Sequence, residues 1–245
     1  MAMVIPAVDI RGGRCVRLLQ GRLDAETVYF DDPVDAAHRW ADQGAELVHV
    51  VDLDGAVEGR PANFDAVARI AEEVDVPIEV GGGVRTDEAV ARYLELGVER
   101  LVLGTRALRE PQWLASLCER YPGRIVAGVD ARDGRVTVEG WARTSGVDAL
   151  DFARRLDALG LRALVYTDVA TDGTLSGPNL GALGRLVEAV STPVVASGGI
   201  ASLDDVERVA ALGVEGMIIG QALFTGALSL PEAMARAGHR NDRAP

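Results

Sequence analysis

The chain has 245 residues, of which 48% are hydrophobic, and this suits one large domain with a substantial core. Its formal net charge of −12 argues against binding to nucleic acid or to anionic membrane surfaces, because both require basic patches. No apolar run reaches the length of a membrane span, and residues 1–9 lack the basic start of a signal peptide. The two isolated cysteines, Cys15 and Cys118, are typical of free thiols. We therefore expect a cytoplasmic protein.

Short apolar runs alternate with segments of helical spacing along the whole chain. The runs lack strict polar alternation, which is typical of parallel strands covered on both faces. The predicted strands are 3–9, 47–52, 77–80, 100–104, 125–130, 163–168, 193–197 and 216–220. The predicted helices are 33–44, 63–74, 86–97, 111–121, 148–160, 179–190, 202–213 and 231–237.

Eight alternating units of strand and helix predict an α/β fold, a single (β/α)8 TIM barrel over residues 1–240. The polar residues 241–245 are expected to form a disordered tail. A doubly wound open sheet is the competing fold, but its glycine-rich dinucleotide fingerprint is absent from the sequence.

The chain repeats itself after about half its length. Residues 77–104 match residues 193–220 at an offset of 116, and farther upstream an offset of 121 pairs Asp9 with Asp130. Because Asp, Asn, Pro and Glu residues match in register as well as glycines, the repeat predicts a barrel of two duplicated half-barrels. Their bounds are about 1–122 and 123–240.

The paired aspartates are the strongest candidates for chemistry. Asp9 and Asp130 end the first and fifth predicted strands, which lie opposite each other in an eight-stranded barrel. Two carboxyl groups that face across a pocket can act as general base and general acid if their environments separate their pKa values. The alternative is that each aspartate caps its loop or pairs with the nearby Arg11 or Arg132.

Each half also carries a set of residues suited to phosphate, which we name the first and second glycine sites. Glycines after strands allow backbone N–H groups to approach an anion, and the last two loops of such barrels often hold a phosphate. The first glycine site is Gly82, Gly83, Gly104 and Thr105, and the second is Gly198, Gly199, Gly220 and Gln221. Together they predict a small-molecule substrate with a phosphate at each end, whereas the alternative is that these glycines only form tight turns.

Other candidates lie in the loops of the predicted mouth. Arg85 follows the first glycine site and could reach a phosphate, although it could also be an exposed arginine without a role. Asp172 and Gly173 could clamp the substrate or support the second aspartate, and the alternative is an ordinary Asx turn. Trp141 could stack on a heterocycle or pack within its own loop. The long loop after the first strand, which contains Arg17, is a candidate lid.

The sequence contains few residues for metal or covalent chemistry. Its three histidines, His38, His49 and His239, share no spacing that suggests a metal site. It contains no lysine, which excludes a Schiff-base lysine. We therefore expect neither a metal nor another cofactor.

Motifs along residues 3–235 carry a family resemblance. They are PAVDIRGGRCVRL, HVVDLDGA, VGGGVR, VDARDGRV followed by GW, TDVATDGTLSGPN, ASGGI and IIGQALF. The chain resembles the isomerase family of histidine biosynthesis that acts on ProFAR (phosphoribosyl-formimino-aminoimidazole carboxamide ribotide). This resemblance implies a monomeric, cofactor-free enzyme that converts a bisphosphorylated aminoaldose to an aminoketose by an Amadori rearrangement. It implies that Asp130 is the general acid that opens the ribose ring, Asp9 the base that takes the C2′ proton, and Thr167 an assisting residue.

Three alternatives remain open beside this resemblance. The cyclase of the same pathway shares the two aspartates, but it typically has Cys where this chain has Ala7 and needs a glutaminase partner. A bifunctional actinobacterial isomerase also acts on phosphoribosylanthranilate, and it tends to carry Ser where this chain has Gly81. A barrel that binds phosphosugars without catalysis could serve as a sensor. The chain departs from the family at Gln221, where a basic residue is often found.

Overall fold

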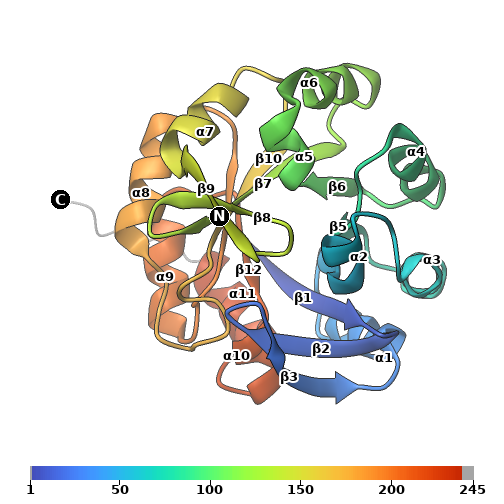
Figure 1. Cartoon of the computed structure of the whole chain (residues 1–245). Helices are drawn as coiled ribbons and strands as arrows, with labels where there is room; N and C mark the ends of the chain where they lie inside the picture. Colours follow the sequence, from blue (N-terminus) through green and yellow to red (C-terminus); the bar gives the residue numbers. More distant parts are fainter. Residues whose placement is uncertain (1, 239–245) are drawn as a thin grey trace.

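A closed ring of eight parallel strands forms the centre of the computed structural model, which describes residues 2–238 (Figure 1). Each strand pairs in parallel with the next, and the last strand returns to the first by pairing Ile218 with Ile5. In ring order the strands are β1 (Met3–Arg11), β4 (Val48–Asp52), β5 (Ile78–Gly81), β6 (Arg100–Leu103), β7 (Ile125–Arg132), β10 (Ala163–Asp168), β11 (Val194–Ser197) and β12 (Gly216–Ile219). The predicted (β/α)8 barrel is confirmed. The predicted tail at 241–245 and His239 lie outside the described residues.

Helices cover the outside of the ring (Figure 1). The larger ones, all predicted, are α1 (Pro33–Asp42), α3 (Phe64–Glu73), α4 (Asp87–Glu95), α6 (Pro111–Arg120), α7 (Ala149–Leu156), α8 (Leu180–Ala189), α9 (Leu203–Ala211) and α11 (Leu230–Gly238). Local sequence sets their starts. Asp32 accepts a hydrogen bond from the Val34 N–H at the start of α1, and Ser202 and Asp205 form a reciprocal capping box on α9. No helix within residues 2–238 combines the length and apolar character needed to cross a membrane.

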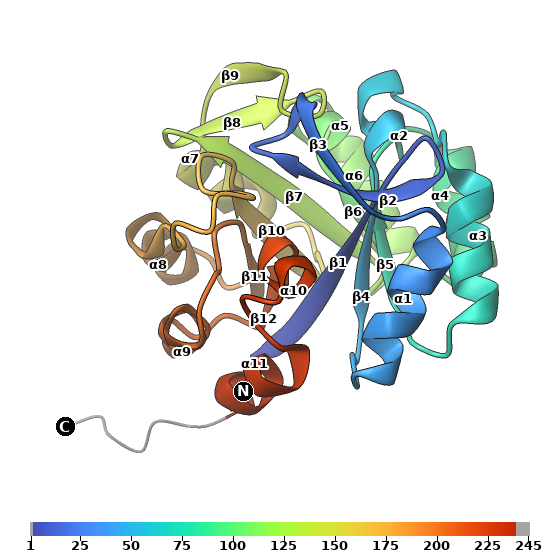
Figure 2. The same cartoon turned by 90° about the horizontal axis from the view of Figure 1, so that it is seen from below.

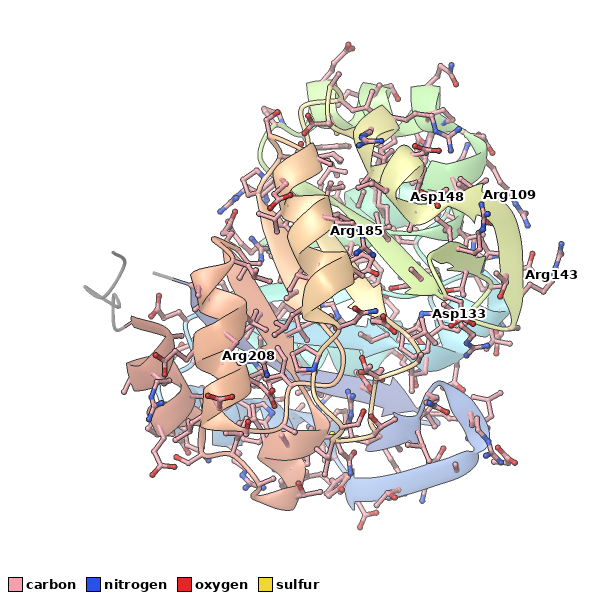
Figure 3. All side chains as sticks on the ribbon, turned by 90° about the vertical axis from the view of Figure 1, so that its left-hand side faces the viewer. Arg109, Asp133, Arg143, Asp148, Arg185 and Arg208 are labelled. Carbon is pink, nitrogen blue, oxygen red and sulfur yellow. The ribbon has the colours of Figure 1, made fainter. Side chains whose placement is uncertain are left out.

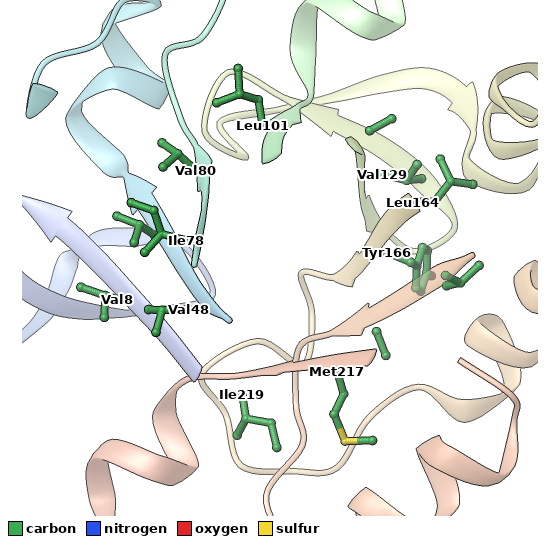
Figure 4. Packing of buried hydrophobic residues seen from close by; sticks show 14 of the residues in the cluster. Val8, Val48, Ile78, Val80, Leu101, Val129, Leu164, Tyr166, Met217 and Ile219 are labelled. Carbon is green, nitrogen blue, oxygen red and sulfur yellow. The ribbon is translucent and has the colours of Figure 1, made fainter. Parts of the chain in front are cut away.

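Two apolar cores hold the barrel together. Alternate residues of a strand point to opposite faces, so Val48 and Val50 enter the outer core between strands and helices. Figure 4 shows members of this outer core distributed round the ring of strands. A smaller inner core fills part of the barrel itself and contains Ile5, Ala7, Leu47, Val126, Ala163, Val165, Val195 and Ile218.

Two antiparallel hairpins, which the sequence analysis did not predict, extend one end of the barrel. The first is β2 (Arg14–Leu19) with β3 (Arg22–Phe30), and the second is β8 (Arg135–Val138) with β9 (Arg143–Asp148). Both lie at the same end, away from α11 (Figure 2). The predicted lid loop after the first strand is therefore a hairpin. The hairpins follow β1 and β7, the two strands that end in Asp9 and Asp130 in the predicted repeat; the duplication itself stays a prediction.

Three short helices were also missed. They are α2 (Leu53–Glu58), α5 (Thr105–Arg109) and α10 (Gln221–Thr225), and each begins within two residues after a barrel strand. Segments this short carry too few residues for a helical period to be visible in the sequence. Helix α5 begins at Thr105 and α10 at Gln221, the last residues of the first and second glycine sites. Both helices therefore lie at the end of the barrel that carries these sites.

Candidate active site

A cavity of about 210 Å³ opens at the end of the barrel that carries the hairpins. All eight barrel strands contribute to its lining, among others through Asp9, Val51, Gly81, Val102, Asp130, Thr167, Ser197 and Ile218. These residues lie at or near the carboxyl ends of their strands. Active sites of TIM barrels lie at this face, so the cavity is the candidate active site.

Asp9 is held by a cation that the sequence analysis had placed in a lid. Arg17 lies on β2, and its Nη1 is 2.7 Å from Asp9 Oδ2 while its Nη2 is 3.6 Å from Asp172 Oδ1. Burial lowers the pKa of Arg17, but the carboxylates of Asp9 and Asp172 outweigh this and raise it overall. The alternative partner Arg11 does not pair with Asp9; its Nη1 lies 2.5 Å from Glu26 Oε2. Arg17 is thus a buried part of the site.

Asp130 lies in a different environment on the opposite strand. Burial raises the pKa of its carboxyl group above the usual value, and hydrogen bonds from Trp141 and Thr167 and the charge of His49 only partly oppose this. Thr167 is the cross-strand neighbour of Asp130 in the register of β7 and β10. The two aspartates therefore differ chemically, since one has a cationic partner and the other is stabilised in its protonated form.

A third carboxyl group lines the same cavity. Asp172 lies in the loop after β10. Burial raises its pKa to about 6 in spite of Arg17, and the charges of Asp9 and Asp130 also raise it. The Arg17 guanidinium group therefore lies beside two carboxyl groups of the cavity, those of Asp9 and Asp172.

The first glycine site forms one wall of the cavity. This wall is lined by Gly82, Gly83, Gly104, Thr105 and Arg85. Gly82 has a φ of 95°, and a Cβ atom at this position would collide with the carbonyl oxygen of Asp52, so only glycine fits. Arg85 donates to the carbonyl oxygen of Ala56 at 2.8 Å, and Arg106 donates to the carbonyl oxygen of Arg85 at 2.7 Å. Arg106, which the sequence analysis did not single out, also lines this wall.

The second glycine site forms a small adjoining cavity of about 10 Å³. It is lined by Gly173, Gly198, Gly199, Gly220 and Gln221. A Cβ atom on Gly198 would lie 2.7 Å from the carbonyl oxygen of Asp168, which repeats the contact of Gly82 with Asp52. The guanidinium group of Arg17 packs against Gly220 and brings a positive charge to this site. Gln221 donates its side-chain amide to the Tyr29 hydroxyl at 3.1 Å.

Two further aspartates hold the loops that position these glycines. The Asp52 carboxylate accepts hydrogen bonds from the backbone N–H groups of Gly55 and Asn63 at 2.8 and 2.9 Å. Asp168 accepts a bond of 2.7 Å from the side-chain amide of Asn179. Because both carboxylates are satisfied by their own loops, we assign them to loop geometry and not to the chemistry.

Trp141 connects the two hairpins above the cavity. It has a φ of 68°, and a Cβ atom on Gly21 of the first hairpin would lie 2.5 Å from the indole ring. The ring therefore packs beyond its own loop. On the outer side of the second hairpin, Glu139 contacts Arg109 and Arg143 at 2.7 and 3.6 Å, and both arginines lie along this edge in Figure 3.

The position of His49 in the cavity was not predicted from the sequence. His49 lines the cavity, and its Nδ1 lies 2.6 Å from Glu79 Oε1. Glu79 Oε2 in turn lies 2.5 Å from Nε of Arg100. The sequence does show His49, Glu79 and Arg100 as ionisable residues in otherwise apolar strands, and this placement was the one feature that could have indicated them.

Within residues 2–238, no group of three or more His, Cys, Asp and Glu side chains is arranged to hold a metal ion. Cys15 and Cys118 are free thiols, and both are buried. Burial raises the pKa of Cys15 to about 12, which leaves it a poor nucleophile. The ionisable groups at the cavity are therefore carboxyl, guanidinium and imidazole groups.

Comparison with known proteins identifies the family of this chain. A family model described as "Histidine biosynthesis protein" matches residues 3–229. A protein of Chloroflexus aggregans is 53% identical over 234 residues, which cover 96% of this chain and 97% of that protein. A protein of Desulfosudis oleivorans is 50% identical over 238 residues, which cover 96% and 95% of the two chains. Each is named 1-(5-phosphoribosyl)-5-((5-phosphoribosylamino)methylideneamino)imidazole-4-carboxamide isomerase.

Proposed function

Since the chain belongs to the histidine-biosynthesis protein family, we propose that it is an isomerase that converts the aminoaldose ProFAR to the corresponding aminoketose. One observation carries this proposal. A single cavity contains Asp9 and Asp130 on opposite strands, with a glycine site on either side. This arrangement suits a substrate that has a phosphate at each end and reacts in the middle.

The first chemical step is ring opening, and it requires an acid. The raised pKa of Asp130 keeps its carboxyl group protonated at a pH where an ordinary aspartate is ionised. Asp130 therefore donates its proton to the ring oxygen O4′ as the C1′–O4′ bond breaks, and a Schiff base forms at C1′. Thr167 assists by its hydrogen bond to this carboxyl group.

The second step is proton abstraction from C2′, and it requires a base. Asp9 takes this proton as a carboxylate, while its ion pair with Arg17 at 2.7 Å keeps the carboxylate in place between β1 and β2. The resulting enolamine then tautomerises to the ketose. Asp172, on the other side of Arg17, clamps the substrate or supports this pair.

The ends of the substrate are held by the two glycine sites. Arg85 and Arg106 flank the first site, and Arg17 brings to the second the positive charge that Gln221 lacks. Backbone N–H groups and guanidinium groups both suit phosphate. Gly173 lines the second site, and Trp141 stacks on the imidazole ring of the substrate at the mouth. Fixing both ends holds C2′ near Asp9, which lowers the entropic part of the barrier.

The proposed enzyme uses neither metal nor organic cofactor, because an acid and a base suffice to open the ring and to move the protons of this isomerisation. We also propose a cytoplasmic monomer. Free buried thiols suit a reducing compartment. The exposed large hydrophobic residues of the described chain are Leu19, Leu23, Val28, Val57 and Leu175. They lie in the first hairpin, in the short helix α2 and in the loop after β10, so none lies on the eight larger helices that cover the barrel.

Steady-state assays of the purified protein on ProFAR and, separately, on phosphoribosylanthranilate test the function. We expect turnover of ProFAR alone, and loss of this activity in both Asp9→Asn and Asp130→Asn. Turnover of both substrates would establish the bifunctional enzyme in spite of Gly81. Ligand binding without turnover of either substrate would refute the isomerase and leave a sensor.

A further inference from the structure

A buried row of ionisable side chains, His49, Glu79 and Arg100, crosses part of the barrel and has no role in the proposed acid–base pair. We call this row the ladder. His49, Glu79 and Arg100 are cross-strand neighbours on β4, β5 and β6. His49 Nδ1 lies 2.6 Å from Glu79 Oε1, and Glu79 Oε2 lies 2.5 Å from Arg100 Nε. Glu79 is 0% exposed and Arg100 only 5% exposed. Burying such groups carries a large desolvation cost.

The other half of the chain indicates that the barrel does not need this ladder for its fold. At the offset of 116, the positions of His49, Glu79 and Arg100 correspond to Val165, Val195 and Gly216 on β10, β11 and β12. Val165 and Val195 belong to the inner apolar core. Replacing buried ion pairs by apolar residues is often neutral or stabilising. A role in the cavity therefore explains the ladder better than stability does.

Glu79 determines how the imidazole ring of His49 is held. Burial would raise the pKa of Glu79, but the hydrogen bond and charge of His49, together with Arg100, lower it overall. An ionised carboxylate can only accept hydrogen bonds, so Nδ1 of His49 is the donor. When the ring is neutral, its lone pair is therefore on Nε2. This nitrogen is left for the chemistry of the cavity, which His49 lines together with Asp9 and Asp130.

Carboxyl groups surround this imidazole ring from several elements. Glu79 faces it from β5, and Asp130 on β7 and Asp172 in the loop after β10 line the cavity into which His49 also opens. Asp9 on β1 lines the same cavity, and its strand pairs Ala7 with His49. His49 therefore shares this cavity with the carboxyl groups of Asp9, Asp130 and Asp172, which can give or take a proton.

The two proposed steps leave one proton transfer without an assigned residue, the loss of the proton on O2′. Asp130 loses its proton to O4′, whereas Asp9 takes a proton from C2′ and can return it to C1′. The ketone at C2′ forms only when the O2′–H bond breaks. Isomerisation neither consumes nor releases a proton overall, so the proton from O2′ has to reach Asp130 before the next turnover. A group that exchanges protons near neutral pH suits this task.

We propose that His49 carries this proton, an inference that rests on the proposed isomerase function. As the C2′=O double bond forms, the O2′–H bond breaks and Nε2 of His49 takes the proton. The Nε2–H bond then breaks and the proton passes to the carboxylate of Asp130, which becomes ready for the next ring opening. Glu79 stabilises the transient imidazolium ion, and Glu79 and Arg100 act as positioning residues.

The test separates abstraction of the C2′ proton from completion of the ketose. The variant is His49→Val, which is expected to fold because Val165 occupies the equivalent place in the other half. The matched control is His38→Val, since His38 is exposed on α1. Each protein is assayed for kcat and KM on ProFAR. In D2O, the deuterium content at C2′ of recovered ProFAR is compared with the amount of product.

We expect kcat of His49→Val to fall by at least about 100-fold with KM changed by less than about threefold. Deuterium should enter C2′ of ProFAR faster than product forms, because Asp9 still removes the C2′ proton. Asp9→Asn should abolish both exchange and product, and His38→Val should behave as the wild type. Glu79→Gln should show the same excess of exchange with a smaller loss of kcat.

A wild-type kcat in His49→Val would overturn the proposal, as would an equal fall of exchange and product formation. His49→Gln serves as a second variant, because its amide can still contact Glu79 but cannot carry a proton, and the same excess of exchange is expected. Failure of the wild-type protein to turn over ProFAR would refute the proposed function itself.

Discussion

Arg17 Nη1 lies 2.7 Å from Asp9 Oδ2, and both side chains are buried, with 6% and 8% of their surfaces exposed. The same guanidinium group packs against Gly220 of the second glycine site. One side chain therefore holds the proposed base and also faces the place of the proposed second phosphate. Its position links substrate binding to the chemistry.

Arg17→Met should destabilise the fold strongly. The variant keeps most of the side-chain volume but leaves Asp9 buried without its cation, and removing one partner of a buried ion pair costs about 3–5 kcal/mol. Urea unfolding followed by circular dichroism measures this free energy. The control is Arg22→Met, because the pair of Arg22 with Asp24 is exposed; its effect should stay within about 0.5 kcal/mol. Equal effects of the two substitutions would contradict the assigned role of Arg17.

Asp172→Asn should stabilise the protein at alkaline pH. The native pKa of Asp172 is raised to about 6, so the folded state binds this proton more tightly than the unfolded state does. Ionisation therefore costs stability as pH rises through 6, by about 2–3 kcal/mol at pH 8. The amide removes this penalty. Thermal unfolding at pH 8 should show a higher Tm than the wild type, and the difference should vanish below about pH 4. A gain independent of pH would count against the burial of this carboxyl group as its cause.

Two glycines of the first glycine site should respond differently to alanine: Gly82 is needed for stability, and Gly104 for substrate binding. Gly82→Ala places a Cβ atom against the Asp52 carbonyl at a φ of 95°, and the unfolding free energy should fall by at least about 3 kcal/mol. A Cβ atom on Gly104 meets nothing within 4 Å. Gly104→Ala should therefore keep its stability and raise KM for ProFAR about tenfold, as the methyl group enters the phosphate site.

Gly146→Ala is the control for both variants, since its Cβ atom would also meet nothing within 4 Å and the residue lies on β9 away from the glycine sites. It should change neither stability nor KM. An unchanged KM in Gly104→Ala would show that no substrate group approaches this residue.

Trp141→Phe should shift the alkaline limb of the pH profile of kcat/KM to higher pH. The hydrogen bond from Trp141 lowers the pKa of Asp130, so removing the indole N–H raises that pKa further. Asp130 acts in its protonated form, and kcat/KM falls as pH rises through its pKa. The fall should therefore occur at a higher pH in Trp141→Phe than in the wild type.

The control for this shift is Trp113→Phe, because Trp113 donates to Asp87 on the outer surface at 2.5 Å. Its profile should coincide with that of the wild type. A limb that stays in place or moves to lower pH in Trp141→Phe would argue against Asp130 as the acid that this profile reports.

The sequence by itself determined the architecture of the barrel. Strands such as 163–168 are mostly apolar because both faces are covered, and helix starts such as Asp32 and Ser202 carry their own caps. These are local properties that a periodic pattern records. The half-chain repeat also pairs Asp9 with Asp130 and matches the two glycine sites.

Only the tertiary structure decided which side chains meet in the cavity. Arg17 was predicted in a lid loop, but the pairing of β2 with β1 brings its buried guanidinium group to Asp9. His49, Glu79 and Arg100 are 30 and 21 residues apart in the chain, and only the register of β4, β5 and β6 aligns them. Such contacts depend on which residues of distant strands are neighbours, and no local pattern encodes this register.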